Sequence, residues 1–242
     1  MKKSIRHAML AVGIIAGSLS AGAHAAFPAD KPVTMVVPFA AGGPTDKVAR
    51  EIALAMGKTL KQQVIVDNSP GAGGTIAAKK VMNAPKDGYT VLIHHIGMST
   101  APGLYKNLGY DPMTDFEHLG MVADVPMVMV ANKDLPAKNL TELLAYIKAN
   151  GAKVNYANAG IGSASHLCGL LFMSTIQQVM TTVPYKGTAP AVTDWLGGQV
   201  QLMCDQTTNL SGQLKAGSVK AYGATTMQRI AAFKDIPTFE VG

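Results

Sequence analysis

Short apolar runs alternate with amphipathic stretches along most of the chain, which predicts an α/β fold. Residues Thr34–Pro38 and Val64–Asp67 are apolar runs of strand length, and apolar side chains recur at every third or fourth position from Val48 to Leu60 between them. The first pattern is typical of a buried strand and the second of a helix with one buried face. Thr45 is the expected N-cap of that helix.

The same alternation continues to residue 225. Further strands are predicted at 89–94, 119–123, 127–130, 153–156, 181–183, 200–204 and 220–225, and further helices at 75–83, 139–150, 163–175 and 190–196. Alternating strands and helices predict a parallel-rich sheet that is covered on both faces. Roughly nine strands suit two small α/β lobes better than one sheet. We expect one lobe from residues 26–124 plus 220–242 and a second lobe from residues 125–219.

Residues 1–25 have the features of a secretory signal peptide. A basic start is followed by an apolar run from Ala8 to Leu19 and by the small-x-small motif Ala23–Ala25. The apolar run is shorter than the roughly twenty residues of a membrane-spanning helix. We therefore expect cleavage between Ala25 and Ala26, export to the periplasm and no membrane anchor.

Composition and charge exclude several classes of protein. Hydrophobic residues make up 48% of the chain and charged residues 15%, which argues against disorder, and 25 glycines and 13 prolines argue against a coiled coil. The formal net charge is +6, but without Lys2, Lys3 and Arg6 only 18 bases remain against 15 acids, a net charge of +3. With no basic cluster, nucleic-acid binding is not expected.

The chain has two cysteines, Cys168 and Cys204. In an oxidising compartment such a pair favours a disulfide, whereas in a reducing one it would be two buried thiols. A bridge would close a loop of about 36 residues and stabilise the fold by roughly 3–4 kcal/mol. The spacing fits neither a zinc site nor a redox pair.

Two glycine-rich turns, at 39–45 and 157–163, follow strands directly and open helices. Free N–H groups at a helix start attract anions, so a turn of this kind in each lobe suggests an anion site, with Ser163 and Ser165 as extra donors. The alternative is a pair of ordinary capped connections. A third turn, Gly71–Gly74, lacks the last glycine of a dinucleotide motif and the lysine of a phosphate loop, so no nucleotide cofactor is expected.

Other polar residues allow weaker interpretations. Ser163 or Ser165 with His166 suggests a secreted serine hydrolase, but position 165 is serine where a nucleophile elbow needs glycine. The histidines are not spaced as zinc ligands, so no metal site is expected. His95 lies at the end of a predicted strand, where α/β sheets place ligands. Asp46 lies at a helix start, where an acid also stabilises the helix dipole.

Several motifs occur along the chain in a defined order. They are Val36–Asp46, Asn68–Gly74, Lys86–Thr90, Tyr110–Pro112, Asn155–Gly160, Ser165–Leu167, Val183–Gly187 and Leu196–Val200. This series resembles the substrate-binding receptors of tripartite tricarboxylate transporters, the Bug family, over essentially the whole mature chain. The cysteine pair is similar to that of the subgroup in which the two are bridged.

The resemblance implies a type II periplasmic-binding-protein-like fold with two α/β lobes, which close over a ligand by a hinge motion. It implies a small carboxylate ligand (a di- or tricarboxylate, an acidic amino acid or an aromatic carboxylate), membrane transporter subunits as partners, a monomeric receptor, and neither a cofactor nor an enzymatic reaction. The ligand-binding residues that it implies are Phe39, Ala40, Gly43, Thr45 and Asp46 in the first lobe, and Gly160, Gly162, Ser163, Ser165, His166, Thr188 and Asp205 in the second. His94 and His95 depart from the small residues expected there, so we expect His95 to discriminate between ligands.

Receptors of this family continue past residues 236–242 into a segment that completes the first lobe. The resemblance therefore predicts an incomplete first lobe in this chain. Two other functions stay open on the residues alone, a secreted serine hydrolase and a truncated remnant without function.

Overall fold

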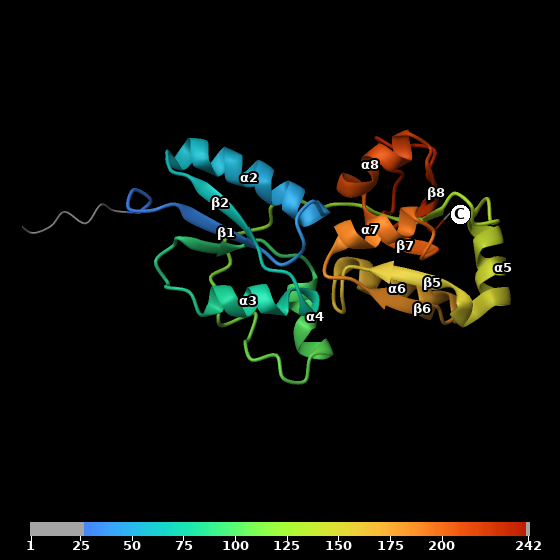
Figure 1. The fold of residues 1–242 in the computed structure, drawn as a ribbon, viewed down its shortest axis with the longest axis horizontal. Helices are drawn as coiled ribbons and strands as arrows, with labels where there is room; N and C mark the ends of the chain where they lie inside the picture. The colour runs from blue at the N-terminus through green and yellow to red at the C-terminus, as the bar shows by residue number, and fades with distance from the viewer. Residues whose placement is uncertain (1–26, 241–242) are drawn as a thin grey trace, which may run out of the picture.

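The computed structural model describes residues 27–240, which form two lobes that lie side by side (Figure 1). The predicted signal peptide, residues 1–25, lies outside the described residues. In chain order the elements are β1 (Val33–Val37), α2 (Pro44–Leu60), β2 (Val64–Asn68), α3 (Thr75–Met82), β3 (Thr90–Leu92), α4 (Gly97–Leu104), β4 (Met127–Asn132), α5 (Leu140–Asn150), β5 (Asn155–Asn158), α6 (Ala164–Ile176), β6 (Thr181–Pro184), α7 (Thr188–Leu196), β7 (Leu202–Gln206), α8 (Thr207–Lys215) and β8 (Val219–Ala224).

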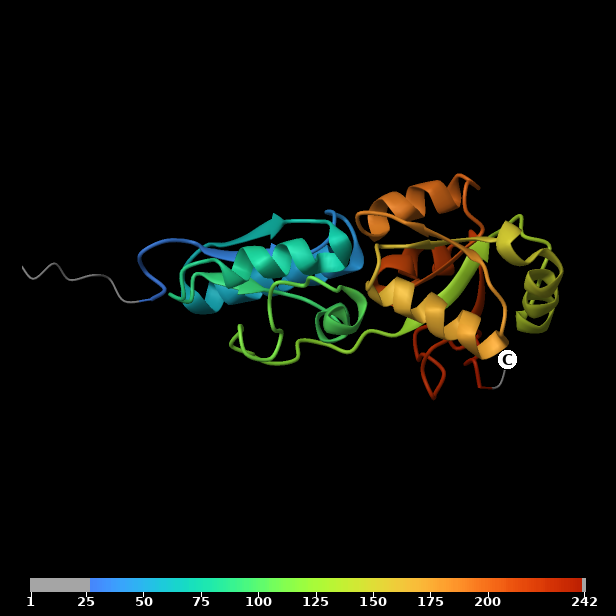
Figure 2. The ribbon, with the colours of Figure 1, turned by 90° about the horizontal axis from the view of Figure 1, so that it is seen from below.

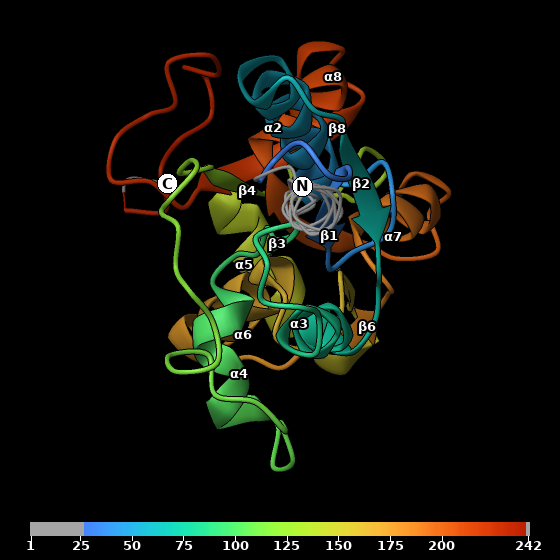
Figure 3. The same cartoon turned by 90° about the vertical axis from the view of Figure 1, so that its left-hand side faces the viewer.

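The first lobe is built on a three-stranded parallel sheet with the strand order β2-β1-β3. Helices α2 and α3 lie on opposite faces of this sheet (Figures 1 and 3). Met35 and Val37 of β1 are buried with Ala49 of α2 on one face. On the other side, Ala78 of α3 is buried with Ala101 of α4. The central strand is therefore covered on both faces, which explains why its sequence is apolar without alternation.

The second lobe is built on a five-stranded sheet with the order β6-β5-β7-β4-β8. Strand β5 runs parallel to β6 and β7, whereas β4 runs antiparallel to β7 and β8, so the sheet is mixed. Leu143 of α5 and Phe172 of α6 pack in one core cluster, and Trp195 of α7 and Leu210 of α8 pack in the other. Figure 2 shows α6 and α7 on either side of the sheet. The predicted α/β architecture of two lobes is thus what the chain forms.

Residues 219–240 belong to the second lobe, whereas residues 220–242 were predicted to belong to the first. Strand β8 pairs antiparallel with β4 and forms the edge of the larger sheet. Tyr222, which is buried, belongs to a core cluster of this lobe, and the ring of Phe239 lies 5.6 Å from that of Phe172. The apolar side chains of this segment are buried only against the second lobe, which explains the difference.

The strand predicted at 119–123 is not formed. This stretch is extended and unpaired, and it leads from the first lobe to the second. Leu119 is 84% exposed and Met121 is 88% exposed. An apolar run becomes a strand only when it pairs with a partner strand. Among the described residues, no strand pairs with residues 119–123. We call residues 119–126 the connecting segment.

Side chains cap two of the helices, and the predicted cap of a third is wrong. Asn139 caps α5, since its side chain accepts a hydrogen bond from the backbone N–H of Glu142 at 2.9 Å, and Ser163 caps α6 in the same way. Helix α2 begins earlier than predicted, with Gly43 as the N-cap and Pro44 in its first turn, so Thr45 is not its cap. Proline at the first helical position accounts for this, because its fixed φ angle suits that position.

The disulfide between Cys168 and Cys204 is formed and confirms the predicted pair. It joins α6 to the central strand β7 of the second lobe, with 6.2 Å between the two Cα atoms.

Over residues 27–240, no helix is both long and apolar enough to cross a membrane.

Candidate functional site

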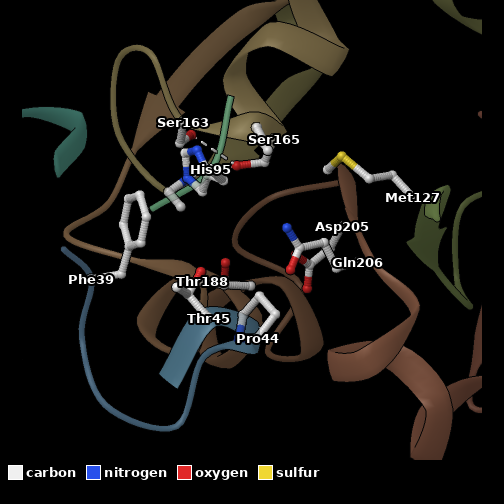
Figure 4. Close-up of a pocket in the computed structure, with 12 residues that line it drawn as sticks. Phe39, Pro44, Thr45, His95, Met127, Ser163, Ser165, Thr188, Asp205 and Gln206 are labelled. Atoms are coloured by element: carbon white, nitrogen blue, oxygen red, sulfur yellow. Dashed lines mark hydrogen bonds between the residues drawn. The ribbon is translucent and has the colours of Figure 1, made fainter. Parts of the chain in front are cut away.

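A cavity with about 290 Å³ of empty space, part of it open to solvent, lies between the two lobes (Figure 4). The first lobe contributes Phe39, Pro44, Thr45 and His95 to its lining. The second lobe contributes Met127, Ala159, Ser163, Ala164, Ser165, Thr188, Asp205 and Gln206.

Four helices begin at this cavity. Pro44 is the first residue of α2, Ala164 the first of α6 and Thr188 the first of α7, while Gln206 is the N-cap of α8, and all four residues line the cavity. The first N–H groups of a helix have no partner within the helix, and each helix start carries a partial positive charge. The cavity is therefore suited to an anion, although no lysine or arginine lines it.

The first-lobe turn between β1 and α2 is shaped by Asp46. Its carboxylate accepts hydrogen bonds from the N–H of Gly42 at 2.8 Å, from Nε of Arg50 at 2.9 Å and from Nδ2 of Asn68 at 2.9 Å. Burial alone would raise the pKa of Asp46, but these hydrogen bonds hold it below the usual value. Because its oxygens are occupied in this way, Asp46 supports the turn and does not line the cavity.

The second-lobe turn, residues 159–163, carries the start of α6. The hydroxyl of Ser163 accepts a hydrogen bond from the N–H of His166 at 3.2 Å, and the two serine hydroxyls, of Ser163 and Ser165, lie 3.0 Å apart. Ser165 Oγ also accepts a hydrogen bond from the N–H of Ala159 at 2.8 Å. Both hydroxyls are thus held in place at the wall of the cavity.

The ring of His166 is bonded to the turn and not to either serine. Its Nδ1 accepts a hydrogen bond from the N–H of Gly162 at 3.2 Å, and no hydrogen bond joins its ring to Ser163 or Ser165. Burial also lowers the pKa of His166. A hydrolytic serine needs a base within hydrogen-bond reach, so this arrangement of the described residues gives the hydrolase interpretation no support.

His95 faces the cavity as a neutral hydrogen-bond donor. Its ring stacks on Phe39 at 4.8 Å, and its Nδ1 accepts a hydrogen bond from the N–H of Gly97 at 2.9 Å. Nδ1 is therefore unprotonated, and the ring hydrogen is on Nε2. Burial, together with the neighbouring His94, lowers the pKa of His95 to about 3, so the ring carries no charge at neutral pH.

Asp205 carries a buried carboxyl group at the wall of the cavity that lies across from His95 (Figure 4). Its side chain is 1% exposed, and it accepts a hydrogen bond from Nδ2 of Asn209 at 2.7 Å. Burial raises the pKa of Asp205 to about 7, in spite of this bond and of Lys47 nearby. Lys47 of the first lobe donates a hydrogen bond to Oδ1 of Asn209 at 3.0 Å and so bridges the two lobes.

The structure brings together about half of the predicted ligand-binding residues. Those that line the cavity are Phe39, Thr45, His95, Ser163, Ser165, Thr188 and Asp205. Those that belong to the same turns without lining it are Ala40, Gly43, Asp46, Gly160, Gly162 and His166.

Five residues that were not predicted also line the cavity: Pro44, Met127, Ala159, Ala164 and Gln206. Four of these are direct neighbours of predicted residues, so adjacency in the sequence would have found them. Met127 opens β4 after the connecting segment and has no such signal. Among residues 27–240, no three histidine, cysteine or acidic side chains gather as they would around a metal ion.

The sequence of this chain matches a known protein family and several of its relatives. Residues 48–242 match the family described as the tripartite tricarboxylate transporter family receptor. A relative from Agrobacterium vitis, named as a UPF0065 protein in the TAR-I ttuE-ttuC' intergenic region, is 48% identical over 211 residues, which make up 87% of this chain. The chain spans 61% of the length of that relative.

Two solved structures match this chain over most of its described length. The periplasmic binding protein BugD is 53% identical, with a TM-score of 0.86 over 88% of this chain and 71% of that one. MatC from Rhodopseudomonas palustris, with bound malate, is 40% identical, with a TM-score of 0.85 over 89% of this chain and 73% of that one. These matches confirm the predicted binding-protein fold.

Proposed function

This chain belongs to the family of tripartite tricarboxylate transporter receptors, and on that premise we propose that it captures a small organic carboxylate in the periplasm and delivers it to membrane transporter subunits. The observation that carries the proposal is the convergence of four helix starts on one cavity between the lobes. The malate bound to the related MatC supports the same class of ligand.

The cavity would hold a carboxylate through hydrogen bonds rather than through ion pairs. Backbone N–H groups at the starts of α2, α6 and α7 and the hydroxyls of Thr45, Ser163 and Thr188 supply the donors. Hydrogen bonds to a charged group are stronger than neutral ones, and they strengthen further where water is excluded. His95 adds one neutral donor from Nε2, which suits it to a ligand hydroxyl, carbonyl or carboxylate oxygen.

We expect at least one carboxylate to bind with a stoichiometry of one per chain. The test is calorimetric titration with L-malate, succinate, adipate, citrate, L-aspartate and nicotinate. The dimethyl ester of each dicarboxylate that binds is the control, and we expect it to bind at least about a hundredfold more weakly, because two charge-assisted hydrogen-bonding groups are lost. Absence of binding for the whole panel would rule out the receptor function, and equal affinity for acid and ester would rule out carboxylate recognition.

Asp205 predicts a pH dependence of binding. Its pKa of about 7 means that the group is neutral below that pH and anionic above it, beside a ligand that is itself an anion. Binding therefore favours the protonated form, and affinity for a dicarboxylate should fall by about tenfold or more between roughly pH 6.5 and pH 8.5. The neighbouring His95 stays neutral in this window, because its pKa is about 3.

The variant Asp205→Asn should remove this pH dependence and keep affinity high at alkaline pH, as measured by titrations across the same window. Asp235→Asn, which removes an exposed carboxylate outside the cavity, is the control and should keep the wild-type profile. In the ligand-free protein, the raised pKa of Asp205 should also lower stability as pH rises from about 4 to 7, because the unfolded chain releases that proton first. A wild-type affinity that does not change across the window would contradict the prediction.

A further inference from the structure

The third glycine-rich turn, Gly71–Gly74, has an unusual backbone conformation. Its four residues have φ angles of 132°, 45°, 60° and 104°, so all four lie in the positive region, and the second of them is Ala72. Positive φ angles strain the backbone of any residue that carries a side chain, such as Ala72. A conformation of this kind persists only where the surrounding contacts require it. The turn lies between β2 and α3 and does not line the cavity, so ligand contact does not explain it.

This turn touches the second-lobe turn backbone to backbone. A Cβ atom added at Gly73 would lie 1.8 Å from the carbonyl oxygen of Ile161, and one added at Gly160 would lie 3.4 Å from the backbone nitrogen of Gly73. Tyr105 of the first lobe donates a hydrogen bond from its hydroxyl to the same carbonyl of Ile161 at 2.7 Å. There is no room for any side chain at Gly73 while the lobes are in this position.

A second contact of the same kind lies between Gly187 and Ala40. A Cβ atom added at Gly187 would lie 2.7 Å from the backbone nitrogen of Ala40. That nitrogen donates a hydrogen bond to the carbonyl of Lys186 at 3.1 Å. We call the contacts of Gly73 with Ile161 and of Gly187 with Ala40 the glycine seam.

We propose that Gly73 and Gly187 are positioning residues for ligand capture, because they allow the two lobes to close to backbone contact. The inference rests on the proposed function, in which closed lobes enclose the ligand. The turn that carries Ile161 also carries Ser163 and the start of α6. Seating this turn on Gly73 therefore sets the position of that helix start relative to the start of α2.

The steric conflict at Gly73 depends on the position of the lobes. Ile161 belongs to the other lobe, so a methyl group at position 73 meets its backbone only in the closed arrangement. The nearest atom of the first lobe would be the Tyr105 hydroxyl at 3.0 Å, the far end of a side chain that can shift once its hydrogen bond to Ile161 is released. Gly73→Ala should therefore disfavour closure without unfolding either lobe. Gly217→Ala is the matched control, since Gly217 has a φ of 59°, against 60° at Gly73, and no atom lies within 4 Å of the added Cβ.

The test measures closure directly, by double electron–electron resonance between spin labels on the two lobes. Leu54→Cys in α2 and Leu171→Cys in α6 provide the labelling sites, since these side chains are 60% and 70% exposed. In Gly73→Ala we expect the ratio of closed to open molecules to fall about tenfold or more, both without ligand and with L-malate. Malate affinity should fall by a similar factor through faster dissociation, while the melting temperature without ligand should equal that of Gly217→Ala.

Unchanged distance distributions and unchanged malate affinity in Gly73→Ala would overturn the proposal. A melting temperature well below that of Gly217→Ala would also overturn it, because Gly73 would then be needed within its own lobe. Wild type could bind no carboxylate of the panel while Gly73→Ala still shows fewer closed molecules than wild type. In that case the role of the glycine seam in closure is supported and the receptor function is contradicted. If wild type and Gly73→Ala bind malate equally, the receptor function stands and the glycine seam fails.

Discussion

Gly43→Asp should abolish carboxylate binding without loss of stability. Gly43 is the N-cap of α2, and no side chain caps this helix. A Cβ atom at this position fits, since its nearest neighbours would be the carbonyl oxygen of Ala40 at 3.5 Å and Cβ of Thr188 at 3.8 Å. Aspartate is among the best N-cap residues, so its carboxylate should accept the first N–H groups of α2. These are the donors that the ligand needs.

We expect the affinity for L-malate to fall at least about a hundredfold, because charge-assisted hydrogen bonds are lost and a like charge is added at the cavity. The melting temperature should stay the same or rise. Calorimetry and thermal unfolding measure the two effects separately. Gly43→Ala, which adds the Cβ atom without the carboxylate, is the control and should bind malate much as wild type does. Unchanged affinity in Gly43→Asp would mean that the start of α2 does not contact the ligand.

Removal of the disulfide should lower the free energy of unfolding by about 3–4 kcal/mol, the value expected for a closed loop of 36 residues. The double variant Cys168→Ala/Cys204→Ala is suitable, because Cys204 is fully buried and serine would place an unpaired hydroxyl in the core. Urea unfolding measures the loss.

Reductant provides the control for this prediction. Dithiothreitol should destabilise wild type by a similar amount and leave the double variant unaffected. An equal unfolding midpoint for oxidised wild type and the double variant would show that the bridge does not stabilise the fold. Because the bridge joins α6 to β7, which carry Ser165 and Asp205, we also expect the double variant to bind malate more weakly.

Local sequence signals predicted the parts of the site that depend on local structure. Ser163 could be recognised because a strand, two glycines and a helix-capping residue follow one another directly, and the structure places its hydroxyl at the cavity wall. His95 could be recognised from its place at the end of an apolar strand. In both cases the information lies within about ten residues, which is the range over which turn and capping preferences act.

Long-range pairing accounts for most of what could not be predicted. Residues 119–123 and β8 have similar apolar patterns, yet only β8 lies beside a free strand edge, that of β4. Helix α4 contains Pro102 and Gly103, which disfavour a helix locally, and it is stabilised by packing of Ala101 against the first-lobe core. Such partners are decided by tertiary contacts, which override local preference.

The connecting segment has a further consequence for how the lobes meet. Within residues 27–240 the first lobe ends before it and the second begins after it, so in this part of the chain the segment is the covalent link between lobes that otherwise meet through non-covalent contacts. The two lobes then behave like binding partners on a short tether, whose length sets an effective concentration of one lobe for the other. Changes in the tether should alter how often the lobes meet, whereas changes at their contact surface should alter how long they stay together.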